Sequence, residues 1–295
     1  MLDMQVSSRA SETAITFPVG TEQVQGTLFL PPAAPRAAVV INGAAGVPHR
    51  FYRAFATWLS TEQGLAVLTY DYRDFASSAT RSPAKSRLKM ADWALVDQPA
   101  ARAEIRRHLP GVPLWVIGHS FGAMLMPLQD GLEDIERMIT VGSGLITLND
   151  HGWPYQLLAR LFWYGHVPLI VRAKGYVPAR VSGFGTDIPG SVYWQWRQWC
   201  TDPHTLYPEI GETLPAPQWS QSGAEVDLIA FSDDPIVKHV GLQRLAGLYG
   251  LPKSRIRMLE PGAFGLKSVG HIGPFAKANK VVWPSLIAEA PHRDG

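Results

Sequence analysis

The chain of 295 residues contains a single cysteine, Cys200, so no disulfide can form within it. Cys200 follows Trp199 in an aromatic stretch without a recognisable motif, and we interpret it as a packing residue rather than a nucleophile. No stretch approaches the roughly 18 consecutive apolar residues of a membrane span. Residues 1–25 also lack the apolar run and cleavage site of a signal peptide. We therefore expect a cytoplasmic protein.

An excess of charge of either sign is lacking too, because 27 Lys and Arg residues face 25 Asp and Glu residues. The densest basic stretch, residues 81–89, is interleaved with Ser, Pro and Ala and has no aromatic platform. We expect it to be a solvated loop, and we expect no nucleic-acid partner. The His and Cys spacings of metal sites and the glycine fingerprint of dinucleotide sites do not occur, so no metal and no cofactor is expected.

Short apolar runs alternate with amphipathic stretches along most of the chain. Two alternating segments, residues 14–17 and 24–30, predict a hairpin. Strands are then expected at residues 38–41, 65–70, 114–117, 138–141, 226–231 and 256–259, and helices at residues 51–59, 91–109 (with Pro99 as a start or kink), from 121, and near 281–287. Strands this apolar must be covered on both faces. The sequence therefore predicts an α/β fold with a mostly parallel sheet and helices on either side.

The alternation breaks between residues 149 and 221. This stretch is rich in Pro and Gly, and it holds six of the ten tryptophans, namely Trp153, Trp163, Trp194, Trp196, Trp199 and Trp219. We interpret it as a mainly helical insertion, because the α/β pattern continues on both sides. The predicted organisation is a core of residues 1–148, an insertion of residues 149–222 and a second core part of residues 223–295. The alternative is a continuous fold with long irregular loops.

A serine lies between two glycines where the strand at 114–117 ends. Residues 118–122 read Gly-His-Ser-Phe-Gly, directly before an expected helix. A serine in so tight a strand-to-helix turn adopts a strained backbone that exposes its hydroxyl, and only glycine fits two residues before and after it. Ser120 is therefore the expected nucleophile. The alternative is an ordinary glycine-rich turn.

A serine nucleophile needs a base, and the base needs an acid that orients it. In this type of fold the order along the chain is Ser, then Asp or Glu, then His. Asp233 and Asp234 follow the strand at 226–231. We favour Asp234 because the residue before a proline is held extended, whereas Asp233 could cap the following turn. His271 lies in a loop after the last strand and is the expected base; a structural loop histidine is the alternative.

Backbone N–H groups should stabilise the oxyanion that forms in acyl transfer. We expect them from Phe121, after the serine, and from Ala44, in the small-residue loop after the strand at 38–41; an ordinary tight turn is the alternative there. His49, near that loop, is a candidate for the pocket wall. Within the insertion, Tyr193, Trp196 and Cys200 share one helical face and suit a packed interior. Trp194 lies on another face and is expected to contact the substrate.

Several stretches together resemble the α/β-hydrolase superfamily over nearly the whole chain, and more narrowly the bacterial α/β hydrolases labelled lysophospholipase-like or serine aminopeptidase-like: "GVPHRFYRAFATWL", "LAVLTYDYRDFASS", "GHSFGA", "SVYWQWRQWC", "FSDDPIV" and "GHIGPF". The resemblance implies a serine triad and a cap inserted after the sixth core strand. Two departures stand out. Asn42 replaces the usual histidine of the oxyanion loop. Residues 71–78 lack the two glycines of the usual Asp-x-Arg-Gly-x-Gly-x-Ser pattern, which predicts a differently shaped loop.

We therefore expect a serine hydrolase that cleaves an ester, thioester or related acyl bond of a small-molecule substrate through an acyl-enzyme. One alternative is an acyltransferase that uses the same triad, and another is a binding protein that keeps the fold without turnover. The aromatic insertion, with few charges, should cover an apolar acyl pocket.

Overall fold

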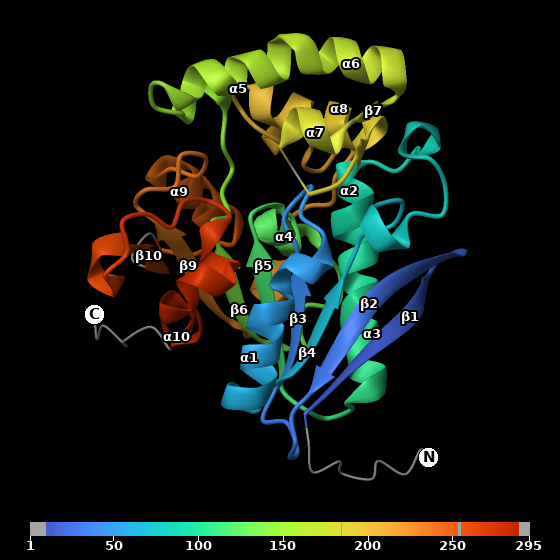
Figure 1. Cartoon of the computed structure of the whole chain (residues 1–295), viewed down its shortest axis with the longest axis vertical. Coiled ribbons are helices and arrows are strands. Elements are labelled where there is room, and N and C mark those ends of the chain that lie inside the picture. The colour runs from blue at the N-terminus through green and yellow to red at the C-terminus, as the bar shows by residue number, and fades with distance from the viewer. Residues whose placement is uncertain (1–9, 184, 253–254, 289–295) are drawn as a thin grey trace.

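A mostly parallel β-sheet forms the centre of the molecule (Figure 1). The computed structural model describes residues 10–183, 185–252 and 255–288. Within these residues the main sheet has eight strands in the order β1-β2-β4-β3-β5-β6-β9-β10, and only the pairings of β2 with β1 and β4 are antiparallel. The strands are β1 Ser11–Val19, β2 Glu22–Leu30, β3 Ala38–Asn42, β4 Ala66–Tyr70, β5 Leu114–His119, β6 Ile135–Val141, β9 Glu225–Phe231 and β10 Ile256–Leu259. The predicted α/β architecture is confirmed.

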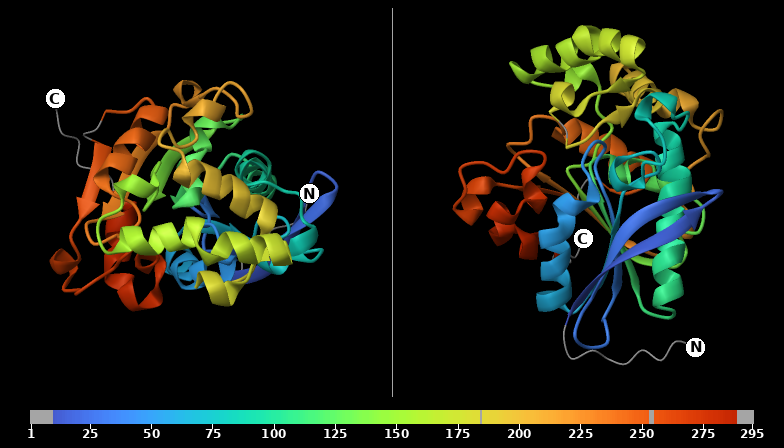
Figure 2. Two further views of the ribbon diagram at one scale, coloured as in Figure 1. Left: turned by 90° about the horizontal axis from the view of Figure 1, so that it is seen from above. Right: turned by 45° about the vertical axis from the view of Figure 1, so that its right-hand side comes forward.

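Both faces of the sheet are buried, because side chains alternate between two hydrophobic clusters. In β3, Ala38 and Val40 face one cluster, whereas Val39 and Ile41 face the other. Helices α1 (Arg53–Gln63) and α10 (Trp283–Ile287) cover one face, and α3 (Gln98–His108) and α9 (His239–Leu248) cover the other. The right panel of Figure 2 shows α1 and α3 on opposite sides of the sheet. This explains why the strands read as unbroken apolar runs.

The helix expected at residues 91–109 is interrupted near its start. It begins as α2 (Met90–Asp92), continues as a π-helical turn (Trp93–Asp97) and becomes regular in α3. Pro99 lies in the first turn of α3, where a missing N–H and a fixed φ are tolerated. Of the predicted start or kink at Pro99, the start is confirmed, because α3 begins at Gln98 directly after the π-helical turn.

The helix expected after Ser120 lasts for only one turn. It ends as α4 (Phe121–Met124) and is followed by a 3-10 turn at Met126–Leu128. Pro127 explains the stop, because its ring would clash with the carbonyl of Ala123, four residues earlier. That carbonyl accepts a hydrogen bond from the Tyr249 hydroxyl at 2.9 Å instead. The predicted helix start at residue 121 is confirmed, and its end after one turn was not predicted.

The segment between β6 and β9 is mainly helical and lies above the carboxyl ends of the parallel strands (Figure 1). It contains α5 (Tyr155–Tyr164), α6 (His166–Lys174), α7 (Ala179–Ser182), α8 (Gly190–Thr201) and a two-stranded ribbon of β7 (Tyr176–Val177) and β8 (Ile188–Pro189). In the view from above in Figure 2, α5 and α6 form the outermost layer. Among the described residues, no helix is long and apolar enough to cross a membrane.

Candidate active site

Ser120 occupies the strained turn between β5 and α4. Its φ of +52° and ψ of −116° lie outside the regions that side-chain-bearing residues usually adopt. A Cβ added at Gly118 would lie 2.6 Å from the Cβ of Ala123, and one added at Gly122 would lie 2.1 Å from the carbonyl oxygen of Asn42. Both glycines are therefore required by close contacts around the turn, as the sequence pattern indicated.

Three side chains form a hydrogen-bonded array at the carboxyl edge of the sheet. His271 Nδ1 lies 2.7 Å from Asp234 Oδ2, and His271 Nε2 lies 2.9 Å from Ser120 Oγ. Because a carboxylate only accepts, Nδ1 donates to Asp234, and Nε2 of the neutral ring can accept the serine proton. The three residues come from the loops after β5, β9 and β10, which the sheet brings to one edge. The arrangement can deprotonate a serine hydroxyl.

The two neighbouring aspartates have separate partners. Asp234 is 1% exposed, and its Oδ1 accepts the N–H groups of Ile236 at 2.7 Å and Val237 at 3.0 Å. Asp234 thus both caps the following turn and binds His271. The turn-capping role that the sequence left open for Asp233 therefore belongs to Asp234.

Asp233 instead holds the loop that carries His271. Its Oδ2 accepts hydrogen bonds from Ser268 Oγ at 2.6 Å and from the Val269 N–H at 2.8 Å, and the Gly270 N–H contacts both carboxylate oxygens. Partial burial opposes ionisation, but these hydrogen bonds outweigh it and lower the pKa of Asp233. Asp233 therefore holds the loop that carries His271 without touching the ring of His271.

A buried chain of hydrogen bonds lies beneath the serine turn. His119 Nε2 lies 3.0 Å from the carbonyl oxygen of His271, so it must donate, and His119 Nδ1 is left to accept from the Tyr52 hydroxyl at 2.7 Å. The Tyr52 oxygen in turn accepts the Ala44 N–H at 2.9 Å. Burial, reinforced by the nearby His271, lowers the pKa of His119 to about 3. His119 is thus a neutral link between three loops.

A cavity of about 290 Å³ opens beside this array. Ser120, Phe121 and His271 line it from the core, and Tyr155, Phe162, Trp196 and Trp199 line it from the helices above. Its wall is mostly apolar, and its volume lies at the lower end of the range of ligand pockets, which is about 300–1,000 Å³. Ser120 therefore faces a space suited to an apolar group.

Comparison with known proteins identifies the family. A sequence model described as "Alpha/beta hydrolase family" matches residues 38–282, which is most of the chain. The chain is an α/β hydrolase. A comparison with curated proteins gives no match. The narrower resemblance to the lysophospholipase-like group stays a prediction.

Solved structures share the fold of this hydrolase at low sequence identity. A thioesterase domain from the curacin biosynthetic pathway is 15% identical with a TM-score of 0.56, covering 94% of this chain and all (100%) of that domain. A thermostable carboxyl esterase from Bacillus coagulans is 14% identical with a TM-score of 0.53, covering 85% and 89% of the two chains. A serine hydrolase without a lid from Xanthomonas campestris is 12% identical with a TM-score of 0.53, covering 94% of each chain. At these identities the likeness concerns the fold alone.

Two predicted pocket residues of the hydrolase lie elsewhere, because neither Trp194 nor His49 is among the residues that line the cavity. The ring of Trp194 lies 5.0 Å from the Arg172 guanidinium instead. His49 Nδ1 lies 3.1 Å from the hydroxyl of Thr69, and the His49 N–H donates to Asp71 Oδ1 at 2.7 Å. Burial lowers the pKa of His49. Both residues support neighbouring segments.

The sequence analysis did not predict which side of α8 lines the cavity, although the residues on that side share a regular spacing. Trp196, Trp199 and Cys200 are spaced three and four residues apart, which places them on one helical face. That face turns toward the cavity. Burial raises the pKa of the Cys200 thiol to about 12, so the thiolate needed for nucleophilic attack does not form near neutral pH. This agrees with a packing role for Cys200.

Two buried polar atoms of the cavity residues lack partners. Thr205 Oγ1 and His151 Nδ1 have no hydrogen bond among the described residues. Thr205 also has a φ of +58°, which is unfavourable for a β-branched residue. Burial lowers the pKa of His151, which favours the neutral ring. Together with Ser120 and His271, these two residues are the polar part of a mostly apolar wall.

The loop after β4 has positive φ at two positions where the family pattern has glycine. Asp74 and Ala76 replace the two glycines of the family pattern, yet both have positive φ, +55° and +44°. The backbone thus has a left-handed conformation at the two positions where the family pattern has glycine, and the expectation of a differently shaped loop stays a prediction. A left-handed conformation costs a residue with a Cβ roughly 1–2 kcal/mol, so the surroundings must hold it.

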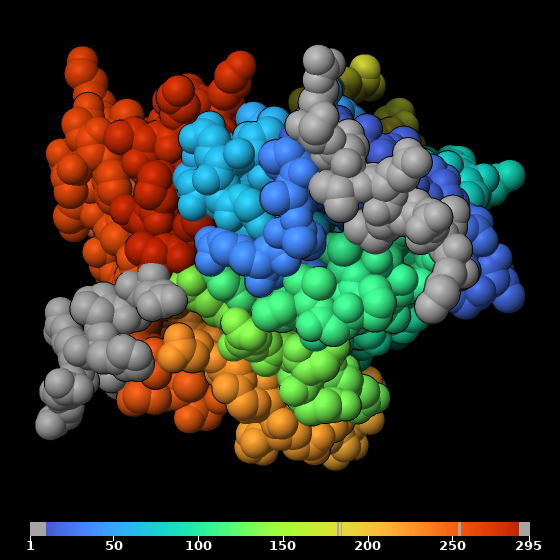
Figure 3. Space-filling view, turned by 90° about the horizontal axis from the view of Figure 1, so that it is seen from below, coloured from blue at the N-terminus to red at the C-terminus, as the bar shows by residue number. Residues whose placement is uncertain are grey.

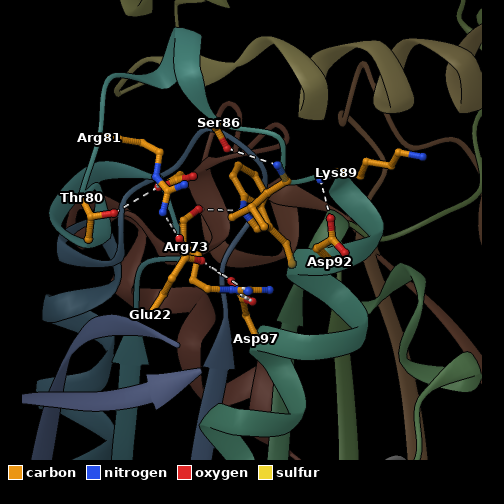
Figure 4. A network of polar contacts seen from close by, with 11 residues as sticks. Glu22, Arg73, Thr80, Arg81, Ser86, Lys89, Asp92 and Asp97 are labelled. Atoms are coloured by element: carbon orange, nitrogen blue, oxygen red, sulfur yellow. Dashed lines mark hydrogen bonds and ion pairs between the residues drawn. The ribbon is translucent and has the colours of Figure 1, made fainter. Parts of the chain in front are cut away.

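Charged side chains brace this loop (Figure 4). Arg73 Nε donates to Asp97 Oδ1 at 2.6 Å, and its guanidinium reaches Glu22 Oε2 at 3.4 Å. Arg81 contacts Asp74 at 3.1 Å and also pairs with Glu22. Burial raises the pKa of Asp97 to about 7 despite the opposing contacts with Arg73. The network offsets the backbone strain in the loop.

Proposed function

We propose that this α/β hydrolase is a serine hydrolase that cleaves an ester, thioester or related acyl bond of a small-molecule substrate. The observation that carries the proposal is the Ser120–His271–Asp234 array at the mouth of an apolar cavity. Ser120 Oγ attacks the acyl carbonyl while its proton passes to His271 Nε2. His271 then protonates the leaving group, and an acyl-enzyme on Ser120 results.

Water then hydrolyses the acyl-enzyme: water is now the nucleophile and Ser120 Oγ is the leaving group. His271 Nε2 takes a proton from water, the hydroxide attacks the acyl carbon, and the proton returns to Ser120 Oγ as the acid departs. Asp234 stabilises the imidazolium that forms in each half-reaction. Its Oδ1 bonds to two backbone N–H groups keep the carboxylate fixed while Oδ2 serves His271.

Backbone N–H groups would stabilise the oxyanion. Phe121 begins α4, and the first N–H groups of a helix have no partner within it, so the Phe121 N–H is one proposed donor. The second proposed donor, the Ala44 N–H, donates to the Tyr52 hydroxyl in this structure. It can serve an oxyanion only after it leaves that hydroxyl, so the Tyr52 contact must break or lengthen during the reaction.

We further propose that residues 149–222 act as a cap whose aromatic side chains bind the acyl group. Trp163 stacks on Tyr193 with ring centroids 5.7 Å apart, and Trp196 meets Trp163 edge-on at 5.1 Å. Trp163 and Trp196 also line the cavity. A wall of packed aromatic rings gives affinity that grows with each buried methylene, on the order of 0.8 kcal/mol per CH₂.

A panel of esters, thioesters and aminoacyl amides tests the proposed reaction. Wild-type protein should hydrolyse at least one class, and Ser120→Ala should lower its kcat by several orders of magnitude. Ser60→Ala is the matched control, because the hydroxyl of this buried serine has no hydrogen-bond partner among the described residues and Ser60 lies in α1, away from the cavity. Turnover that survives Ser120→Ala would refute the proposal. Added alcohol or amine acceptors would reveal acyl transfer in place of hydrolysis.

A further inference from the structure

The outer helices of the cap segment contain no acidic residue. Between Asp150 and Asp187 the sequence has neither Asp nor Glu, although acidic and basic residues nearly balance in the whole chain. The same stretch contains four basic side chains, Arg160, Arg172, Lys174 and Arg180. All four residues are exposed. One end of the molecule is therefore positively charged.

Large apolar side chains are exposed on the same helices. Of the eleven large hydrophobic residues that are exposed in the described part of the chain, six lie between residues 153 and 169. Trp153 is 79% exposed, Leu169 is 66% exposed and Leu158 is 60% exposed; the others are Leu157, Leu161 and Tyr164. We call the six apolar and four basic residues together the cap surface. A gathering of exposed apolar side chains in a monomer marks an interaction site.

The cap surface is at one extreme of the molecule. Helices α5 and α6 form the outermost layer above the carboxyl edge of the sheet (Figures 1 and 2). The face seen from below is made mainly of core segments (Figure 3). A planar partner could therefore approach the outer helices without meeting the core.

Helix α5 is apolar on two sides. Tyr155, Ala159 and Phe162 line the cavity, whereas Leu157 and Leu161 are exposed to the outside. Leu158 is both exposed and part of the cavity wall. A helix that is hydrophobic all round is normally covered on all sides. No segment in the described part of the chain covers the outer side of α5, which adjoins the cavity that holds Ser120.

We propose that the cap surface docks on an anionic lipid bilayer. Exposed Leu, Trp and Tyr side chains flanked by Arg and Lys suit the boundary between lipid headgroups and acyl chains. The excess of positive charge requires a negative partner. A second copy of the chain that met this surface across a twofold axis would bring its basic residues against one another. Docking would place the cavity beside the bilayer.

Vesicle co-sedimentation tests the proposal. Ser120→Ala protein is used, so binding is measured without lipid cleavage and independently of the proposed catalytic chemistry. We expect binding to mixed phosphatidylcholine and phosphatidylglycerol vesicles, at least about tenfold weaker binding to phosphatidylcholine alone, and a decline with added salt. Equal binding to both vesicle types, or to neither, would overturn the proposal.

Paired substitutions locate the contact. Arg160→Glu with Lys174→Glu should weaken vesicle binding by at least about tenfold, and Leu161→Ser with Leu169→Ser should weaken it as well. The control is Lys277→Glu with Lys280→Glu, which makes the same change in net charge at exposed lysines outside the cap segment. An equal loss in the control would show general charge attraction and contradict docking by this surface.

Folding and competing partners are checked with the same variants. The melting temperature and the hydrolysis of a short soluble ester by the corresponding Ser120-containing proteins should be unchanged, because the four substituted cap residues do not line the cavity. Light scattering reports self-association. A dimer that Leu161→Ser with Leu169→Ser abolishes, or binding to polyglutamate without binding to vesicles, would assign the cap surface to a protein partner and overturn the proposal.

Discussion

The sheet edge that carries Ser120 and the helical segment above it are held in different ways. At the edge, directional hydrogen bonds fix nearly every group: Asp234 binds both a turn and His271, and Asp233 holds the loop of His271. Beneath them, His119 and Tyr52 connect three loops through buried polar contacts. Each of these groups has one geometry in which its bonds are satisfied.

The cap segment is held mainly by apolar contact. Its interior is a cluster of packed aromatic rings, Phe162, Trp163, Tyr193 and Trp196. Polar ties to the core include the ion pair of Asp150 with Arg244 and the hydrogen bond from Ser191 Oγ to the carbonyl of Leu88 at 2.7 Å. Apolar contacts have no preferred direction. Substitutions should therefore have graded effects in the cap and abrupt effects at the sheet edge.

The largest contrast is expected between the two aspartates. Asp234→Asn should lower kcat by about 10⁴-fold, as loss of the orienting carboxylate does in a serine triad. Asp233→Asn should lower it by only about tenfold, because the loop of His271 loses a charged acceptor but the ring keeps its partner. Saturation kinetics on the best ester of the panel measure both. A larger loss for Asp233→Asn would reverse the assignment.

The next effect concerns pH and the buried His119. Its pKa of about 3 lies below the value of about 6.5 in the unfolded chain. The unfolded state therefore takes up the proton first, and the free energy of unfolding should fall as the pH falls from about 6.5 toward 3. Urea unfolding at a series of pH values measures this slope.

Two variants isolate the contribution of His119. His119→Gln keeps a donor and an acceptor but cannot titrate, so its stability should depend less steeply on pH. His166→Gln is the control, because it makes the same substitution at an exposed histidine of α6. If the free energy of unfolding depends on pH equally in wild type and His119→Gln, His119 does not cause the loss of stability at low pH.

A smaller, graded effect on the acyl chain-length dependence of kcat/KM should distinguish two tryptophans of α8. Trp196 lines the cavity, whereas Trp194, two residues earlier, does not. In wild type, kcat/KM should rise severalfold with each CH₂ of the acyl chain until the cavity is full. Trp196→Ala should flatten this dependence and Trp194→Ala should preserve it. Flattening by Trp194→Ala alone would mean that the acyl group lies outside the cavity described.

The smallest effect is expected in the loop after β4. Ala76→Gly should raise the free energy of unfolding by about 1 kcal/mol, because glycine adopts a φ of +44° without strain. Ala79→Gly, at a φ of −73°, should lower it by about 0.5 kcal/mol. Urea unfolding measures both changes. If both variants are destabilised equally, Ala76 is not strained.

The core could be predicted from sequence because its signals are local. Strands covered on both faces must be apolar throughout, and the Gly-His-Ser-Phe-Gly turn has a steric requirement at each glycine. Pro127 is a local signal for the early end of α4, but the Tyr249 hydroxyl that binds the freed Ala123 carbonyl comes from a distant part of the chain and could not be predicted. The Tyr52 contact of the Ala44 N–H is likewise a tertiary interaction.

The helical content between β6 and β9 was predictable, but its detailed packing was not. Aromatic residues occur on several sides of α8, so composition does not show which side faces the cavity. The spacing of Trp196, Trp199 and Cys200 shows that they share one face, and the structure shows that this face lines the cavity. The positive φ of Asp74 and Ala76 could not be foreseen either. A network that includes Arg73 and Arg81 holds the loop in a conformation that local preference disfavours.

The most direct measurement is labelling with a fluorophosphonate, followed by intact mass and peptide mapping. We predict one adduct per chain, on the oxygen of Ser120, together with loss of hydrolysis in proportion to labelling. Ser120→Ala should not be labelled, and Ser60→Ala should be labelled like wild type. An adduct on any other residue, or hydrolysis that persists in fully labelled protein, would contradict the proposal that Ser120 is the nucleophile.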